Sequence, residues 1–256
     1  MILGLSHIVL ASTDLIRDRQ HLEQLGWATT FEQRGIATHP GKRAWMSTDS
    51  NEQGLVFMQP PSGTPVELIH YANELADASP SPLQIVLPTS EVTLSQASTC
   101  ATALPGVIEQ SVPQLTCPLW LSQAAPVPSL IIHHVTDMAA AQRFWQEGLG
   151  FKPSIHPAEI VGAVQMELRS LMAQWRATLL LLPRHGPAVP HLLDGPGYRC
   201  LSFVVSDLQQ DRQRLLRAGA RECTGPFQLE VNAKSLALEL LAGPDGAMIE
   251  IFQTAS

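Results

Sequence analysis

Three polar side chains interrupt apolar, strand-like segments of this 256-residue chain and could carry chemistry. His7 precedes an Ile-Val-Leu run, Glu67 lies between valine and leucine, and Glu250 lies between two isoleucines. Side chains alternate along a strand, so each points away from its apolar neighbours. His7 could be a satisfied histidine and Glu67 a solvated carboxylate. A carboxylate with aliphatic neighbours on a closed sheet needs a partner, however, and Glu67 and Glu250 have matching surroundings. Imidazoles and carboxylates bind metal ions and act as general bases.

The elements that must position these residues occur as a repeat. Residues 4–27 and 129–151 each read as a β-rich run, an Asp, an amphipathic helix and then Leu-Gly-aromatic. One gap aligns the landmark pairs Asp14/Asp137, Leu25/Leu149, Gly26/Gly150 and Trp27/Phe151. Internal repetition constrains the fold before any other pattern, and differences between the copies indicate where a site lies.

A weaker second repeat, 83–111 and 200–227, divides the chain into four units of strand, helix and several strands. Ser90 and Ser206 are the predicted helix N-caps, and 207–218 reads as an amphipathic surface helix. Unit 2 is short, and the Pro-containing stretch 122–129 is the best linker. The predicted domains are therefore 1–124 and 129–256. Further strands are expected at 28–34, 43–48, 54–59, 65–70, 164–171, 177–182, 227–231, 235–241 and 247–252.

Composition restricts the class of protein. The net charge is −7 without a basic block, which argues against a nucleic-acid partner. No apolar run approaches the roughly 20 residues of a membrane span, and the N-terminus reads as a strand rather than a signal peptide. The four cysteines form no CxxC, so reduced thiols in a cytoplasmic protein are expected. The expected partner is a small molecule, and the expected state a monomer or homodimer.

Three motifs resemble the vicinal oxygen chelate superfamily, which includes glyoxalase I, bleomycin- and fosfomycin-resistance proteins and extradiol dioxygenases. They are SHIVLASTDL followed by a helix and LGW or LGF, PVELIHYAN at 65–73, and GPDGAMIEIF at 243–252. The resemblance implies an α+β fold of four βαβββ modules, arranged as two tandem halves with cupped mixed sheets. It is a poor guide to the reaction, because one scaffold supports many chemistries.

The resemblance also implies metal ligands on the first and fourth strands of paired modules. Unit 1 offers His7 and Glu67, and unit 4 offers Glu250 with Cys200 at its first-strand position. Gln84 in unit 2 is the remaining polar residue, because unit 3 has Leu130 and an apolar fourth strand. If unit 1 pairs with unit 4, one site holds His7, Glu67 and Glu250. If each half works alone, Gln84 could join His7 and Glu67.

One imidazole and two carboxylates suit a divalent ion such as Fe, Mn, Zn or Ni, and Glu250 is the candidate catalytic base. The leading hypothesis is an isomerase, lyase or dioxygenase acting on a small oxygenated metabolite. The alternative is a metal-free protein, similar to bleomycin-resistance proteins, that sequesters a hydrophobic drug or natural product. A structural or regulatory partner is a third reading. His70 and Tyr71 are expected to line the same cup as Glu67, and His133 and His134 to lie on opposite faces of their strand.

Overall fold

A computed structural model describes most of the chain, including both copies of the repeat, 4–27 and 129–151. The described residues are 1–61, 63–71, 83–88, 98–99, 107–110, 119–122, 129–155, 161–169, 176–184, 186, 192–195 and 197–254. Ser90, the helix predicted after it and the linker core 123–128 lie outside them.

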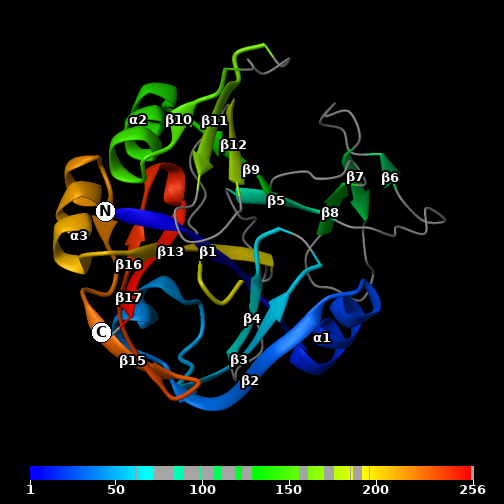
Figure 1. The fold of residues 1–256 in the computed structure, drawn as a ribbon. Coiled ribbons are helices and arrows are strands. Elements are labelled where there is room, and N and C mark those ends of the chain that lie inside the picture. Colours follow the sequence, from blue (N-terminus) through cyan, green and yellow to red (C-terminus); the bar gives the residue numbers. More distant parts are fainter. Residues whose placement is uncertain are drawn as a thin grey trace.

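Strands of the described residues form two curled sheets (Figure 1). The first sheet contains β1 (Ile2–Ala11), β2 (Ala28–Ala37), β3 (Glu52–Gln59), β4 (Val66–Tyr71), β13 (Gly197–Val205), β14 (Arg221–Glu222), β15 (Phe227–Val231), β16 (Lys234–Ala242) and β17 (Met248–Thr254). The second contains β5 (Leu83–Pro88), β6 (Ser98–Thr99), β7 (Val107–Gln110), β8 (Leu119–Ser122), β9 (Ser129–Val135), β10 (Lys152–Pro153), β11 (Val164–Arg169) and β12 (Arg176–Pro183). The expected α+β class is confirmed.

The modules pair in the crossed manner. In the first sheet the strand order is β14-β16-β17-β13-β1-β4-β3-β2, with β15 on β16, so unit 1 adjoins unit 4. In the second sheet the order is β10-β11-β12-β9-β5-β8-β7-β6, so unit 2 adjoins unit 3. The antiparallel pairs β1–β13 and β5–β9 make the two joints. Each sheet therefore takes strands from both the N-terminal and the C-terminal parts of the chain.

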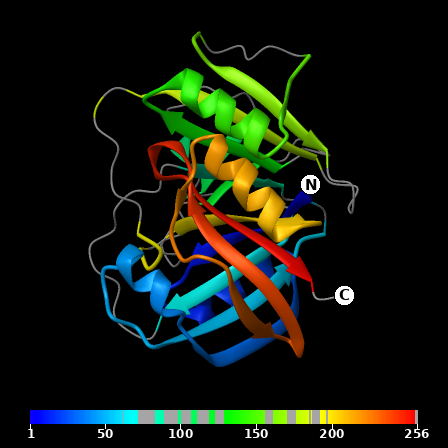
Figure 2. The ribbon, with the colours of Figure 1, turned by 90° about the vertical axis from the view of Figure 1, so that its left-hand side faces the viewer.

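The α-helices lie on the outer faces of the sheets. They are α1 (Leu15–Gln24), α2 (Met138–Arg143), which continues into the π-helical turn η3 (Phe144–Gly148), and α3 (Leu208–Arg217). The short 3-10 helices η1 (Pro40–Trp45) and η4 (Pro244–Gly246) lie in connections between strands. Figure 2 shows α2 and α3 side by side, and the Arg214 guanidinium donates to the Gly148 carbonyl at 3.0 Å. None of the described helices is long and apolar enough to cross a membrane.

The repeated landmarks are helix boundaries. Asp14, Asp137 and Asp207 are N-caps whose side chains accept backbone N–H groups of the first helical turn. The prediction of Ser206 as an N-cap is therefore wrong by one residue, because Asp207 caps that helix. Gly26 and Gly150 follow the helices with φ of 85° and 81°, a left-handed conformation that glycine adopts without a Cβ penalty.

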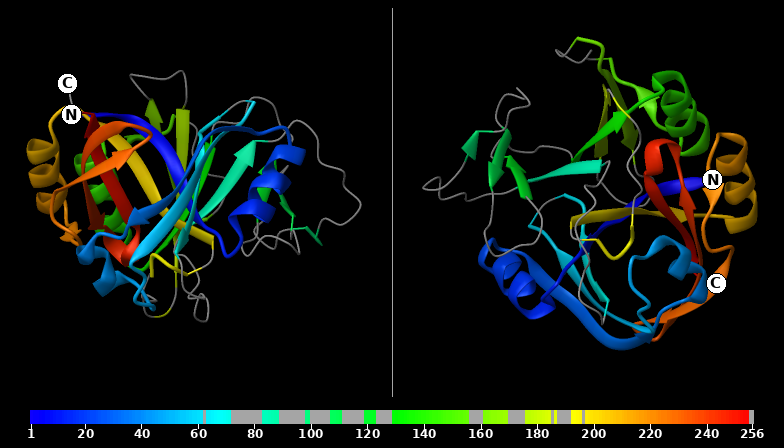
Figure 3. Two further views of the ribbon diagram at one scale, coloured as in Figure 1. Left: turned by 90° about the horizontal axis from the view of Figure 1, so that it is seen from below. Right: turned by 180° about the vertical axis from the view of Figure 1, so that it is seen from behind.

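Buried apolar residues form one large cluster that joins the outer helices to both sheets. Its largest fully buried members include Phe144, Trp145, Phe151 and Phe203. Viewed from below, the strands of the first sheet are strongly curved, with α1 and α3 outside the curve and a concave face on the other side (Figure 3). This concave face, here called the first cup, is where His7, Glu67 and Glu250 lie.

The strand predicted at 43–48 is wrong, because that segment contains η1 instead. Pro40 begins the helix, and the His39 side chain accepts the Gly41 N–H at 3.1 Å. After the helix, the Asp194 carboxylate accepts the backbone N–H groups of Ser47 and Thr48 at 2.9 and 2.8 Å. These contacts hold the segment across one end of the cup.

Candidate functional site

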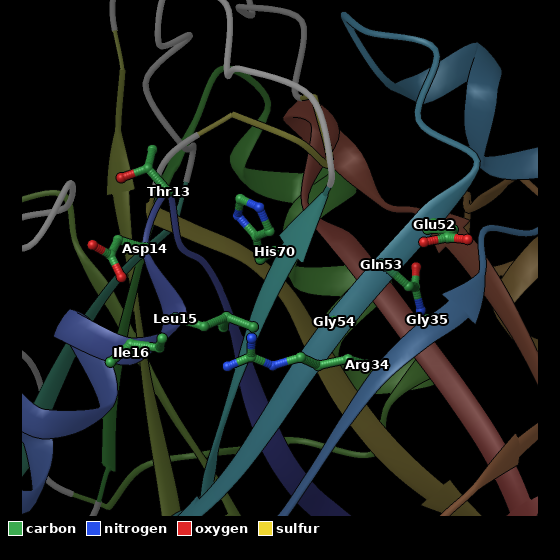
Figure 4. A pocket seen from close by; sticks show the side chains of 10 residues that line it. All are labelled: Thr13, Asp14, Leu15, Ile16, Arg34, Gly35, Glu52, Gln53, Gly54 and His70. Carbon is green, nitrogen blue, oxygen red and sulfur yellow. The ribbon is translucent and has the colours of Figure 1, made fainter.

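Among the cavities lined by described residues, two adjoin the strands of unit 1. The larger, about 390 Å³, lies beside the start of α1 on the outer face and is lined by Asp14, Arg34 and His70 among others (Figure 4). Its polar groups are already engaged: Asp14 caps α1, Arg34 binds Glu32, and His70 Nδ1 lies 2.9 Å from the Ser12 carbonyl oxygen. His70 therefore does not line the same cup as Glu67, because strand alternation directs it outward.

The inner cavity, about 220 Å³, occupies the first cup. His7 from β1, Glu67 from β4 and Glu250 from β17 meet there, although they are far apart in sequence. His7 Nε2 lies 3.7 Å from Glu67 Oε2 and 4.0 Å from Glu250 Oε1. The structure thus brings together all three residues singled out in the sequence.

His7 presents Nε2 to the two carboxylates. Its other ring nitrogen, Nδ1, lies 3.0 Å from Ser6 Oγ, and its ring packs edge-on to Phe57 with centroids 5.2 Å apart. Nε2 is buried without a hydrogen-bond partner among the described residues. An orphaned buried nitrogen is uncommon and calls for an explanation such as a ligand or ion.

Without a metal ion, the surroundings of His7 and Glu67 disfavour the charged form of each side chain. Burial lowers the pKa of His7 to about 4, against the opposing effect of Glu250. Burial raises the pKa of Glu67 to about 8, and the nearby Glu250 carboxylate adds to the rise. Two carboxylates sharing a desolvated site repel each other, and a cation between them would relieve that repulsion.

Units 1 and 4 each place two side chains at matching positions of the first cup. Glu67 pairs with Val9 on β1, and Glu250 pairs with Ser202 on β13. Because side chains alternate along a strand, His7, two residues before Val9, faces the same side as Glu67, and Cys200, two residues before Ser202, faces the same side as Glu250. The four equivalent positions are therefore His7, Glu67, Cys200 and Glu250.

The second sheet has four matching positions, but they carry no imidazole or carboxylate. The same register rules apply to β9 with β12 and to β5 with β8, and their equivalent positions are Leu130, Leu180, Gln84 and Trp120. These positions offer one amide and no carboxylate or imidazole. Gln84 lies on the second sheet, with Oε1 3.5 Å from His134 Nε2, so it does not join His7.

Cys200 is the register counterpart of His7 but lies in apolar surroundings. It packs with Val9, Tyr71, Leu240 and Met248 in a cluster that fills the other end of the cup. Its Sγ donates weakly to the Leu201 carbonyl at 3.7 Å, and burial raises its thiol pKa. Tyr71 faces the cup as predicted, while His133 lies on the core side of its strand, accepting the Trp145 indole N–H at 3.1 Å.

Three residues of the site were not identified from the sequence. Ser202 donates its hydroxyl to Glu250 Oε1 at 2.6 Å, which orients that carboxylate. Lys42 and Gln53 line the cavity, are 6% and 3% exposed, and are joined by an Nζ–Oε1 hydrogen bond of 3.2 Å. Ser202 was detectable as the residue two places beyond Cys200. Lys42 immediately precedes the segment 43–48 that was predicted as a strand, and nothing in its local sequence distinguished it from a surface lysine.

The outer wall of the cavity is apolar. It consists mainly of Phe31, Leu55, Phe57, Leu229, Leu236 and Phe252. The β15–β16 hairpin meets β2 across the mouth, where the Asn232 N–H donates to Gln33 Oε1 at 2.9 Å. Trp27 and Trp145, which could have formed aromatic walls, are instead buried in the core. The cavity is therefore lined by a polar cluster around His7 and by this apolar wall, and the polar residues Asn232, Lys234 and Thr254 complete its lining.

The polar cluster fits a divalent ion in donor type. Among the described residues, no three His, Cys, Asp or Glu side chains are arranged to hold a metal as they stand. His7 Nε2 lies 3.7 and 4.0 Å from one oxygen of each carboxylate, too far for a hydrogen bond to either, so His7, Glu67 and Glu250 are the residues that would hold an ion.

Comparison with known proteins identifies the fold. No family model matches the sequence, and no curated protein matches it. Glyoxalase I from Zea mays is similar in structure, with a TM-score of 0.65 and 14% identity over 97% of this chain and 92% of that one. A proposed dioxygenase from Bacillus subtilis has a TM-score of 0.59 and 11% identity over 100% of this chain and 86% of that one. The chain has the vicinal oxygen chelate fold that its motifs predicted.

Proposed function

Because the chain has the vicinal oxygen chelate fold, we propose that it is a divalent-metal-dependent enzyme acting on a small oxygenated metabolite. One observation carries the proposal: a buried imidazole nitrogen, which has no hydrogen-bond partner among the described residues, faces two carboxylates inside a cavity. The structural neighbours named glyoxalase I and dioxygenase support an enzyme of isomerase, lyase or dioxygenase type.

Each residue has a distinct role in this proposal. His7, Glu67 and Glu250 would hold the metal, which would polarise substrate oxygens when bound. Glu250 is also the proposed base. Its Oε1 accepts the Ser202 hydroxyl, which fixes the carboxylate's orientation while the second oxygen remains available for a substrate proton. The apolar wall excludes water from this end of the cavity, which strengthens every charge interaction there.

Metal analysis tests the proposal directly. Wild-type protein purified without chelator should contain about one equivalent of a divalent metal, measured by elemental analysis after gel filtration. His7→Ala and Glu250→Ala should each lose it. His134→Ala, on the second sheet, and Glu230→Ala, exposed on β15, are matched controls that should retain it. Wild-type protein that binds no Fe, Mn, Zn or Ni under any loading condition would refute the proposal.

The apolar wall favours a second candidate function, a protein that binds and sequesters a small hydrophobic molecule. Phe31 stacks on Phe57 with ring centroids 5.4 Å apart at the cavity wall, which would suit a planar ligand. The two functions differ in their dependence on metal. A sequestering protein should bind planar apolar compounds equally well with and without chelator, and His7→Ala should leave that affinity unchanged.

A further inference from the structure

We propose that Lys42 is a specificity-determining residue and that the substrate is a small anion, a carboxylate with an apolar body. The proposal deepens the proposed function and shares its site. It rests on the position of one lysine side chain, the way that η1 holds it, and the balance of charge in the cavity.

The Lys42 ammonium is buried and incompletely paired. Its side chain lines the cavity together with His7, Glu67 and Glu250, and the residue is only 6% exposed. Its one recorded hydrogen bond among the described residues is to Gln53, which leaves two of its three donors available. No carboxylate of the described residues makes an ion pair with it within 4.0 Å, although Glu67 is near enough to interact electrostatically.

Burying an ammonium without a close counter-ion is costly, so lysine is rarely found so deep without a partner. A surface role would let the flexible side chain extend into water. The structure instead turns Lys42 inward from a helix fixed at both ends. The Leu193 N–H donates to the Trp45 carbonyl at 2.7 Å, and Asp194 binds Ser47 and Thr48 beyond the helix.

The charge balance of the metal-loaded site points to an anion. A divalent ion and the Lys42 ammonium contribute three positive charges, and Glu67 and Glu250 contribute two negative ones. The neutral His7 imidazole adds none. The enclosed site is therefore one positive charge in excess, and a monoanionic ligand would neutralise it. Charge-assisted hydrogen bonds from the ammonium would supply both affinity and orientation.

The remaining walls define the rest of the substrate. The outer wall is apolar, with Phe31, Phe57 and Phe252 among its residues, and the volume of about 220 Å³ is below the roughly 300 Å³ at which pockets for drug-sized ligands begin. A small carboxylate whose body is aromatic or branched aliphatic fits both the polar cluster and this wall. Its carboxylate would meet Lys42, and its neighbouring oxygen would lie toward His7.

Two probes of nearly the same shape, one anionic and one neutral, test this assignment. We would titrate 3-phenyllactate and 3-phenyllactamide into Zn²⁺-loaded and chelator-treated protein by calorimetry. Wild-type protein should bind the carboxylate at least about tenfold more tightly than the amide, since one hydrogen bond to a charged group supplies roughly that factor. Lys42→Met should lose the preference, and Lys42→Arg should keep it. Lys152→Met removes an exposed lysine on β10 of the second sheet and should change nothing.

Stability separates a binding role from a structural one. In Zn²⁺-loaded protein without an organic ligand, where the site has one positive charge in excess, Lys42→Met should melt at or above the wild-type temperature, because that excess charge has been removed. A clear drop in melting temperature would indicate a structural lysine and overturn the proposal. Equal affinity of wild-type protein for both probes, no binding of either at about 10 mM, or an unchanged preference in Lys42→Met would overturn it too. Without metal the enclosed site holds two carboxylates and one ammonium, so the preference should be confined to Zn²⁺-loaded protein. Its absence in protein that holds one equivalent of Zn²⁺ would overturn the Lys42 assignment alone, whereas protein that binds no Zn²⁺ would refute the metalloenzyme proposal and this one with it.

Discussion

Replacing Glu67 by glutamine should stabilise the metal-free protein. Burial and the neighbouring Glu250 raise the pKa of Glu67 from 4.5 to about 8. The folded pKa lies above the unfolded one, so the stability contribution is full below about pH 4.5 and is lost as the pH rises through 8. At about pH 7 the penalty reaches about 3 kcal/mol at roughly 1.4 kcal/mol per pKa unit, and above about pH 8 it approaches 5 kcal/mol. Glu67→Gln keeps the shape and cannot ionise, so it removes this penalty.

Urea denaturation in the presence of chelator measures the effect. Glu67→Gln should exceed the wild type by less than about 1 kcal/mol near pH 5 and by about 3 kcal/mol near pH 7. Glu230→Gln, an exposed carboxylate on β15, is the control and should follow the wild type throughout. A difference that fails to widen between about pH 5 and pH 8 would refute the reasoning, because the widening comes only from ionisation of a buried carboxyl. Added metal should reverse the order, since glutamine is a weaker ligand.

Three further outcomes follow from the core and the turns. Burial lowers the pKa of His133 to about 4, so stability present above about pH 6.5 is lost toward pH 4, by at most about 3 kcal/mol. His133→Leu should reduce the dependence of the free energy of unfolding on pH in acid denaturation. It should also cost about 1–3 kcal/mol at neutral pH, since the Trp145 indole N–H loses its acceptor. An unchanged pH dependence would contradict this prediction. Ala233→Gly should raise the free energy of unfolding by about 1 kcal/mol, because Ala233 has φ of 57° in the hairpin turn; a lower melting temperature would argue against strain. Gly243→Ala should cost about 1–3 kcal/mol, because its Cβ would lie 2.7 Å from the buried Phe144 ring; wild-type stability would show that the ring can shift.

Local patterns in the sequence predicted much of this fold. The Asp14 and Asp137 landmarks are N-caps, and the following glycines end the helices. The strand predicted at 227–231 is β15 with the same bounds. Strand alternation and matching surroundings also singled out Glu67 and Glu250, which do converge on His7. Their role as metal ligands remains a prediction.

The sequence did not predict which distant segments of the chain lie side by side. Nothing within β1 indicates that its neighbour is β13, so the choice between crossed and within-half pairing stayed open. The inward orientation of Lys42 depends on η1, and η1 is tied down by Asp194, 147 residues beyond Ser47. The local motif PGKRAW is compatible with a turn, a strand or a 3-10 helix. Only the distant contact selects among them.

The crossed pairing of β1 with β13 has a consequence for biosynthesis. During translation the first four strands of the first sheet leave the ribosome long before β13 and β17, which complete it. Until then, one edge of β1 has no hydrogen-bonding partner, and unpaired strand edges promote aggregation. His7 and Glu67, on β1 and β4, are therefore synthesised well before Glu250, which lies on β17. Premature termination anywhere before residue 250 would therefore yield a product that lacks Glu250 and is prone to associate with itself. Folding of the complete chain should be slow because the contacts between β1 and β13 are non-local.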